Sequence, residues 1–241
     1  MSAPENVRVE SFVDSGVEPQ VRGHLHQPEK SIGDGLILTH GAGSNSRAPL
    51  LVALADAFSS VGFTVLRCDL PYRQVRSYGP PGPGDRTRDR EGLKNAVAVM
   101  RKLAGGRVFL GGHSYGGRQS SMLCASEPDL VDGLLLLSYP LHPPRKPEHL
   151  RTQHLPNLRT PTLLVSGTRD PFGSSEEIEN ALQLIPARTK FVTLEGAGHD
   201  LDFTKGKSGD RGGLRLTILK SFQEFFGKTA NESTDPESAI L

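Results

Sequence analysis

Residues 108–117 read Val108-Phe109-Leu110-Gly111-Gly112-His113-Ser114-Tyr115-Gly116-Gly117, and this stretch decides the fold of the chain. Its apolar start is bounded by glycines on both sides, which predicts a short buried β-strand. The residues that follow Tyr115, as far as Ala125, can continue as a helix. Between strand and helix, residues 112–116 match G-x-S-x-G, so the sequence predicts a tight turn with Ser114 at its apex.

The predicted turn suits a serine that reacts. A strained backbone at the apex exposes the Ser114 hydroxyl, and Gly112 and Gly116 leave room for the strand and the helix to approach each other. The start of the helix also offers backbone N–H groups and a positive dipole end to a developing oxyanion. Ser114 is therefore the candidate nucleophile, and the Tyr115 N–H is a candidate oxyanion donor. The alternative is a glycine-rich turn without a chemical role.

The composition is that of a soluble globular protein without a strong charge. The chain has 241 residues, enough for one sizeable core, with 36% hydrophobic residues and a net charge of +1. This charge favours neither nucleic acid nor an anionic membrane as a partner, and no apolar run reaches the roughly 18 residues of a membrane span. Cys68 and Cys124 are interpreted as buried free thiols, and no signal segment is recognised. We expect one cytoplasmic domain over residues 1–227 and a polar tail over 228–241, and the sequence leaves the oligomeric state open.

Apolar runs and helical periodicity predict the remaining elements. Strands are expected at residues 7–13, 21–26, 36–39, 63–68, 131–140, 161–167 and 191–194. Helices are expected at residues 49–61, 86–104, 174–185 and 211–227, with a loop over 73–85 and a short helix around 147–153. Because strands alternate with helices from residue 36 onward, the predicted fold class is α/β, a mostly parallel sheet with helices on both faces. Only about twenty residues separate the strand that ends near Tyr139 from the next strand, so no cap domain is expected there.

Two further side chains complete a possible catalytic set. A serine hydroxyl needs a base to take its proton and a third group to orient that base. Asp170 follows the predicted strand 161–167, and His199 follows the last predicted strand, so both lie at the carboxyl edge of the sheet with Ser114. The sequence thus predicts Asp170 as the acid and His199 as the base. The alternatives are an aspartate at a helix start and an ordinary loop histidine.

The run His40-Gly41-Ala42-Gly43 predicts the second half of an oxyanion hole. Glycines directly after a strand let the Ala42 N–H turn inward, opposite the Tyr115 N–H. The alternative is an ordinary turn between a strand and a helix. No set of residues with metal-ligand spacing is evident, and a serine mechanism needs no cofactor, so we expect neither a metal nor a cofactor.

These motifs together resemble those of the α/β-hydrolases, close to the compact, capless dienelactone-hydrolase-like members. The run His40–Asn45, the run Gly112–Arg118 and Ser138-Tyr139-Pro140-Leu141-His142 resemble more specifically one subgroup, which contains the third subunit of the NSL histone-acetyltransferase complex and its testis-expressed relative. The resemblance covers about residues 30–227. It implies the nucleophile, acid and base roles at the three positions named above. The subgroup implies no settled substrate, and its large eukaryotic member looks like a scaffold.

The expected activity is hydrolysis of a carboxylic ester or thioester of a small molecule through an acyl-enzyme. Two alternatives stay open at this point. The first is a binding or scaffold module on a hydrolase fold, since a fold alone does not imply a function. The second is acyl transfer or perhydrolysis by the same three residues.

Basic loops at the same edge of the sheet suggest an anionic substrate. Arg73 lies in the first loop and Arg145 in the second, where Tyr139 and His142 are close in sequence. Opposed positive loops would attract and hold a carboxylate or phosphate, so these four residues are candidate substrate-binding residues. The alternative is that the charges are solvated loop charges, and the sequence does not decide between the two.

Overall fold

Strands buried on both faces form the centre of the sheet in a computed structural model, which describes residues 7–201 and 211–227. β3 (Gly35–Thr39), β5 (Val108–His113), β6 (Gly133–Leu137) and β7 (Thr162–Gly167) are almost continuously apolar, as parallel strands covered on both sides must be. The strand order is β1-β2-β4-β3-β5-β6-β7-β8, and every pair from β4 to β8 is parallel. The predicted α/β class is therefore confirmed.

A hairpin forms one edge of this sheet. β1 (Val7–Asp14) and β2 (Val21–Pro28) pair antiparallel, and β2 pairs antiparallel with β4 (Thr64–Asp69). β8 (Thr189–Leu194) forms the opposite edge. Both edge strands are only partly buried, so the core lies over the middle of the sheet.

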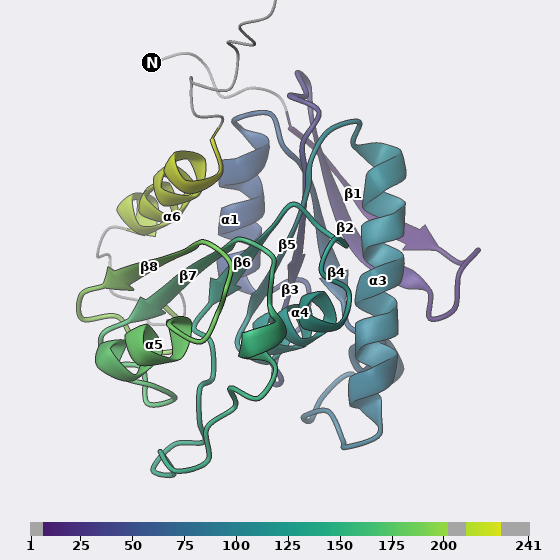
Figure 1. Cartoon of the computed structure of the whole chain (residues 1–241). Helices are drawn as coiled ribbons and strands as arrows, with labels where there is room; N and C mark the ends of the chain where they lie inside the picture. Colours follow the sequence, from purple (N-terminus) through teal and green to yellow (C-terminus); the bar gives the residue numbers. More distant parts are fainter. Residues whose placement is uncertain (1–6, 202–210, 228–241) are drawn as a thin grey trace, which may run out of the picture.

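Helices cover the two faces and create two separate cores (Figure 1). α1 (Pro49–Ser59) and α6 (Arg211–Phe226) pack on one face, where Phe222 lies against Phe58 and Phe109 with ring centroids 4.9 Å apart in both pairs. α3 (Asp85–Leu103), α4 (Tyr115–Ser126) and α5 (Ser175–Leu182) cover the other face. Cys68 and Cys124 are buried in this second core as free thiols.

Two local predictions are wrong. Residues 147–153 form no helix, and a short 3-10 helix at Leu155–Asn157 is the only helix between β6 and β7. Residues 144–150 are all exposed, so this segment has no apolar face that packing could stabilise as a helix. In the predicted loop 73–85, the first residues belong to α2 (Pro71–Val75), whose proline stands at a favourable first position. The predicted tail 228–241 lies outside the described residues.

The strand order brings chemistry-bearing residues to one edge. The segments that follow β3, β4, β5, β7 and β8 all leave the sheet at its carboxyl end, where sites of such sheets form. Among the described residues, no helix is long and apolar enough to cross a membrane.

Candidate active site

Ser114 stands alone between β5 and α4 in a strained backbone conformation. Its φ is 51° and its ψ is −115°, a region that residues with side chains rarely adopt. Glycine is required two residues before and two residues after Ser114, because a side chain at either position would collide with the backbone. A Cβ at Gly112 would lie 2.5 Å from the nitrogen of Gly117, and a Cβ at Gly116 would lie 2.6 Å from the carbonyl oxygen of His40. The turn therefore holds the serine at the carboxyl edge of the sheet in the way that the motif predicts.

The structure brings Ser114, His199 and Asp170 together. His199 Nε2 lies 2.9 Å from Ser114 Oγ, and His199 Nδ1 lies 2.8 Å from Asp170 Oδ2. The carboxylate is buried and also accepts a 2.9 Å hydrogen bond from the backbone N–H of Phe172, which fixes its orientation. The three side chains thus form a chain in which the imidazole can take a proton from the serine while the carboxylate holds its other nitrogen.

Two aromatic neighbours fix the position of His199, and the sequence motifs assign no role to either of them. The Phe172 ring lies 4.2 Å from the imidazole, centroid to centroid, with an interplanar angle of 33°. In addition, His113 Nε2 donates a 2.8 Å hydrogen bond to the carbonyl oxygen of His199. Burial lowers the pKa of His113, so its ring stays neutral while Nε2 donates to this carbonyl oxygen.

The loop after β3 places the candidate donor Ala42 beside the cavity. The carbonyl oxygen of Gly41 accepts hydrogen bonds from the Ser44 N–H (3.1 Å) and the Tyr72 hydroxyl (3.3 Å). Because a trans peptide is planar, the N–H of Ala42 points away from these partners. Ala42 and Ser114 line the same cavity, and Tyr115 is the first residue of α4, where helix N–H groups lack intrahelical acceptors.

The cavity in front of Ser114 is open and mainly apolar. Its volume is about 400 Å³, and its described lining residues are Gly41, Ala42, Gly43, Ser44, Ala48, Pro49, Leu50, His113, Ser114, Phe172, His199 and Asp200. None of these lining residues is a lysine or an arginine. The cavity therefore suits an uncharged, small apolar group better than an anion.

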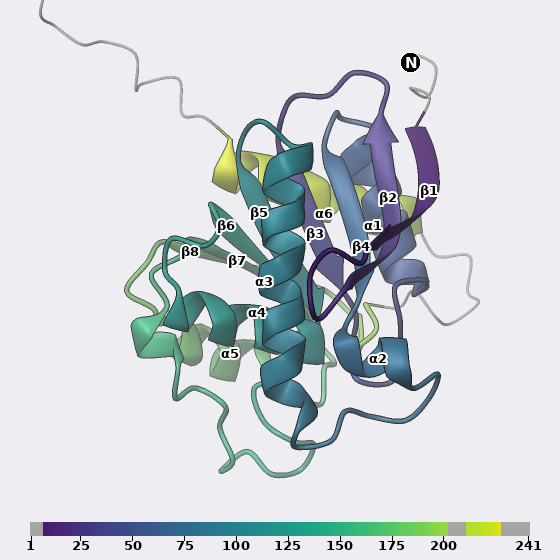
Figure 2. The same ribbon diagram turned by 90° about the vertical axis from the view of Figure 1, so that its right-hand side faces the viewer.

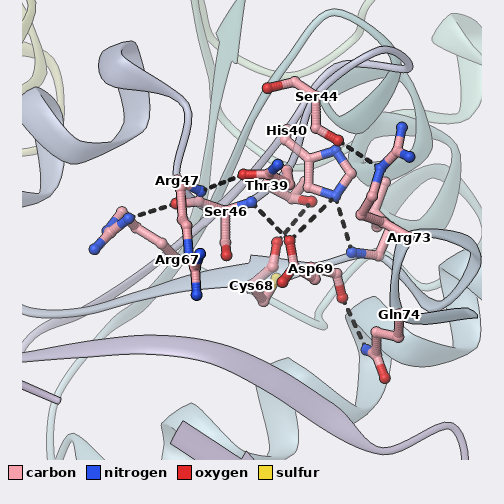
Figure 3. A network of polar contacts seen from close by, with 12 residues as sticks. Thr39, His40, Ser44, Ser46, Arg47, Arg67, Cys68, Asp69, Arg73 and Gln74 are labelled. Atoms are coloured by element: carbon pink, nitrogen blue, oxygen red, sulfur yellow. Dashed lines mark hydrogen bonds and ion pairs between the residues drawn. The ribbon is translucent and has the colours of Figure 1, made fainter. Parts of the chain in front are cut away.

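Arg73 lies behind the loop that carries Ala42 and does not line the cavity. Its guanidinium is buried and donates to the carbonyl oxygen of Ser44 (2.7 Å), a contact drawn in Figure 3. It also donates to the carbonyl oxygens of Ala42 (3.1 Å), Arg76 (3.0 Å) and Gly79 (2.8 Å). These contacts make Arg73 a structural cation that joins two loops.

The other three predicted substrate-binding residues are also absent from the cavity lining. Tyr139 is buried, and its hydroxyl donates a 2.7 Å hydrogen bond to the carbonyl oxygen of Arg151. His142 is buried beside Glu177, with 3.4 Å between Nε2 and a carboxylate oxygen. Arg145 is exposed on the segment between β6 and β7. Sequence proximity suggested a common role for these residues, but their side chains serve the packing of that segment or face solvent.

His40 is a buried structural residue, although the sequence motif His40–Gly43 indicated no role for its side chain. Its Nε2 accepts a 3.1 Å hydrogen bond from the Leu70 N–H, and its Nδ1 donates a 2.9 Å hydrogen bond to the carbonyl oxygen of Gly41. Burial lowers the pKa of His40 to about 4, so the ring is neutral at neutral pH and can play both roles. His40 thereby ties β3 to the end of β4 (Figure 3).

No group of three or more potential metal-ligating side chains occurs in residues 7–201 and 211–227.

The comparisons with known proteins fit the geometry. Residues 33–224 match a family model described as Alpha/beta hydrolase domain.

Two solved structures share the fold over almost their whole length. An alpha-beta serine hydrolase homologue from Coxiella burnetii has a TM-score of 0.69 and 20% identity, covering 88% of this chain and 96% of that one. A dienelactone hydrolase from Anabaena variabilis has a TM-score of 0.69 and 21% identity, covering 91% and 97%. At these identities, the likeness shows the fold alone.

Two curated relatives match shorter segments. One is 2-(acetamidomethylene)succinate hydrolase from Mesorhizobium japonicum, which is 31% identical over 117 residues, 48% of this chain. The other is polyketide synthase ThaQ from Burkholderia thailandensis, 42% identical over 57 residues, 24% of this chain. The matches span only 39% and 3% of the length of these two relatives.

Proposed function

Since the chain belongs to the alpha/beta hydrolase family, we propose that it is a serine hydrolase that cleaves a carboxylic ester or thioester. One observation carries the proposal. His199 stands between Ser114 Oγ, 2.9 Å from its Nε2, and the Asp170 carboxylate, 2.8 Å from its Nδ1. This order of nucleophile, base and orienting acid is the arrangement that activates a serine.

In the first half of the reaction, Ser114 Oγ attacks the acyl carbon while His199 Nε2 takes the hydroxyl proton. Asp170 accepts the hydrogen bond from Nδ1 and stabilises the imidazolium. The bond to the leaving alcohol or thiol then breaks, and His199 returns the proton to that leaving group. An ester between Ser114 and the acyl group remains.

In the second half, His199 takes a proton from water, and the hydroxide attacks the acyl-enzyme. In both halves, the negative charge on the carbonyl oxygen is stabilised by the N–H groups of Ala42 and Tyr115. The carboxylic acid leaves when Ser114 Oγ recovers its proton from His199. Side chains of this protein carry out every proton transfer in the two half-reactions, so the proposed mechanism includes no cofactor.

We propose an uncharged, small apolar acyl group as the part of the substrate next to Ser114. Ala48, Pro49, Leu50 and Phe172 form the apolar part of the lining, and the cavity of about 400 Å³ suits a group of modest size. The candidate basic residues Arg73 and Arg145 do not line this cavity, so the preference for an anionic substrate loses its support. The finer resemblance to the subgroup of the NSL-complex third subunit stays a proposal that rests on the sequence motifs.

Labelling with a fluorophosphonate probe tests the proposal. The wild-type protein should be labelled and should hydrolyse nitrophenyl acetate. The Ser114→Ala variant should take no label and should not hydrolyse the ester. Ser126→Ala is the matched control, because Ser126 ends the same helix and its hydroxyl bonds to the Leu123 carbonyl oxygen. A folded wild-type protein that takes no label would contradict the proposal and favour a binding module. Product analysis with alcohol or peroxide as acceptor distinguishes hydrolysis from acyl transfer.

A further inference from the structure

A buried carboxylate links the two sides of the candidate oxyanion hole. Asp89 on α3 is fully buried and accepts a 2.7 Å hydrogen bond from the Tyr115 hydroxyl. Its other oxygen accepts a 3.1 Å hydrogen bond from the backbone N–H of Tyr72. Tyr115 supplies one candidate oxyanion donor, and Tyr72 belongs to α2, which packs beside the first turns of α3 (Figure 2).

The Tyr72 hydroxyl reaches the loop that carries the other donor. It lies 2.9 Å from the carbonyl oxygen of Ala42 and 3.3 Å from that of Gly41. The Gly41 carbonyl oxygen, which also accepts a 2.9 Å hydrogen bond from His40 Nδ1, is thereby held on the Tyr72 side, and the trans peptide directs the Ala42 N–H the opposite way. Burial raises the pKa of Tyr72 to about 12, so the phenol keeps its proton and stays a donor at neutral pH.

Arg73 strengthens the same contact. It donates to the carbonyl oxygens of Ala42 and Ser44, and its guanidinium carbon lies 4.9 Å from the centre of the Tyr72 ring. A cation on this ring face holds the phenol in place. The loop 41–44 is therefore held by the Tyr72 hydroxyl and the Arg73 guanidinium, in addition to the His40 contact with the Gly41 carbonyl.

We propose that Tyr72 is a positioning residue that sets the oxyanion hole, because its hydroxyl fixes the Gly41–Ala42 peptide and Asp89 joins it to Tyr115. This inference rests on the proposed hydrolase function. Removal of a whole oxyanion donor costs about 10²–10³-fold in kcat. Loss of the Tyr72 hydroxyl leaves both donors in place and only loosens one of them, so we expect a loss of about tenfold.

Tyr72→Phe tests the proposal, because it keeps the buried ring and removes only the hydroxyl. We expect kcat for a short nitrophenyl ester to fall about tenfold while KM changes less than about twofold, since the oxyanion forms only in the transition state. The affinity for an alkylboronic acid should fall by a similar factor, because its tetrahedral adduct with Ser114 Oγ puts an oxygen into the oxyanion hole. The pH profile of kcat should keep its midpoint, because His199 and Asp170 are untouched.

A substrate-free measurement makes the test independent of the proposed activity. Hydrogen exchange at the amides of residues 41–44 should be faster in Tyr72→Phe than in the wild type, while exchange over residues 112–117 stays the same. If the wild-type protein lacks esterase activity, the proposed function fails, and this exchange measurement still decides whether Tyr72 holds the loop.

The control is Val99→Ala, which lowers stability without touching the site. Val99 is buried on α3 next to Met100, whose side chain faces Gly35 at the start of β3, the edge opposite Ser114. It should lose stability and keep kcat, boronate affinity and exchange at 41–44. The proposal is overturned if Tyr72→Phe keeps wild-type kcat, or if kcat falls while boronate affinity and loop exchange stay unchanged.

Discussion

At the scale of single residues, the three side chains at the carboxyl edge should act as a unit. We expect Ser114→Ala and His199→Ala each to lower kcat by about 10⁴-fold or more, and Asp170→Asn somewhat less, because the base must be both present and correctly oriented. Steady-state kinetics on a nitrophenyl ester measures these losses. The double variant Ser114→Ala/His199→Ala should lose no more than either single variant, and losses that multiply would show that the residues act separately.

His154 gives a residue-scale prediction on pH and stability. Burial, aided by the nearby Arg118, lowers its pKa to about 4, whereas the same imidazole in the unfolded chain titrates near 6.5. Between these values the unfolded state binds more protons, so stability is lost as the pH falls from about 6.5 toward 4.

Titration of His154 alone should make the free energy of unfolding about 2 kcal/mol lower at pH 5 than at pH 7. Urea unfolding of the wild type and of His154→Gln at both pH values checks the number, and the variant should lose about 2 kcal/mol less than the wild type on acidification. Equal losses in both proteins would show that His154 is not responsible.

The sequence predicted that Ser114, Asp170 and His199 would meet at one edge of the sheet, but it did not predict the role of Arg73. Ser114, Asp170 and His199 each follow a strand that the apolar pattern defines, and parallel strands deliver their ends to one edge. Arg73 is different, because the carbonyl oxygens of Ala42 and Ser44 that surround it come from a loop about 30 residues away in sequence. Nothing in the local sequence distinguishes this buried cation from a solvated one.

At the scale of secondary-structure elements, α5 was predicted from its capping box, which the structure confirms. The Ser174 hydroxyl accepts from the Glu177 N–H, and the Glu177 carboxylate accepts from the Ser174 N–H. We expect Ser174→Ala to lower the free energy of unfolding by about 1 kcal/mol, as measured in urea. Ser175→Ala, at the first position inside the helix, is the matched control and should change it by less than about 0.5 kcal/mol.

The two errors at this scale have a common physical cause. Short helices depend on tertiary packing, which periodicity in the sequence shows only when the helix is long. The 19-residue α3 was predicted to within one residue at each end, whereas the 5-residue α2 was missed. Tyr72 and Arg73, which hold the loop 41–44, both lie in that missed helix.

At the scale of the whole molecule, the segment between β6 and β7, which is described throughout, should set the preference for acyl length because it forms no cap over the candidate site. The segment between β6 and β7 contains only the 3-10 helix Leu155–Asn157 and packs beside α4, so it does not cover Ser114. We expect nitrophenyl acetate and butyrate to be hydrolysed with higher kcat/KM than the dodecanoate, because only a short chain is enclosed by the cavity of about 400 Å³. Faster turnover of the long ester below its micellar concentration would contradict this view of the site.

Because both cysteines are buried, their thiols should react with alkylating reagents only when the protein unfolds. Burial raises the pKa of the Cys68 and Cys124 thiols to about 12, so almost no thiolate exists at neutral pH and alkylating reagents find no nucleophile in either side chain. Iodoacetamide should therefore leave the native protein unmodified and add two groups once urea unfolds it, as mass spectrometry can count. Fluorophosphonate labelling of the native chain therefore tests Ser114 without a contribution from cysteine, while the rate of alkylation measures how often the core opens.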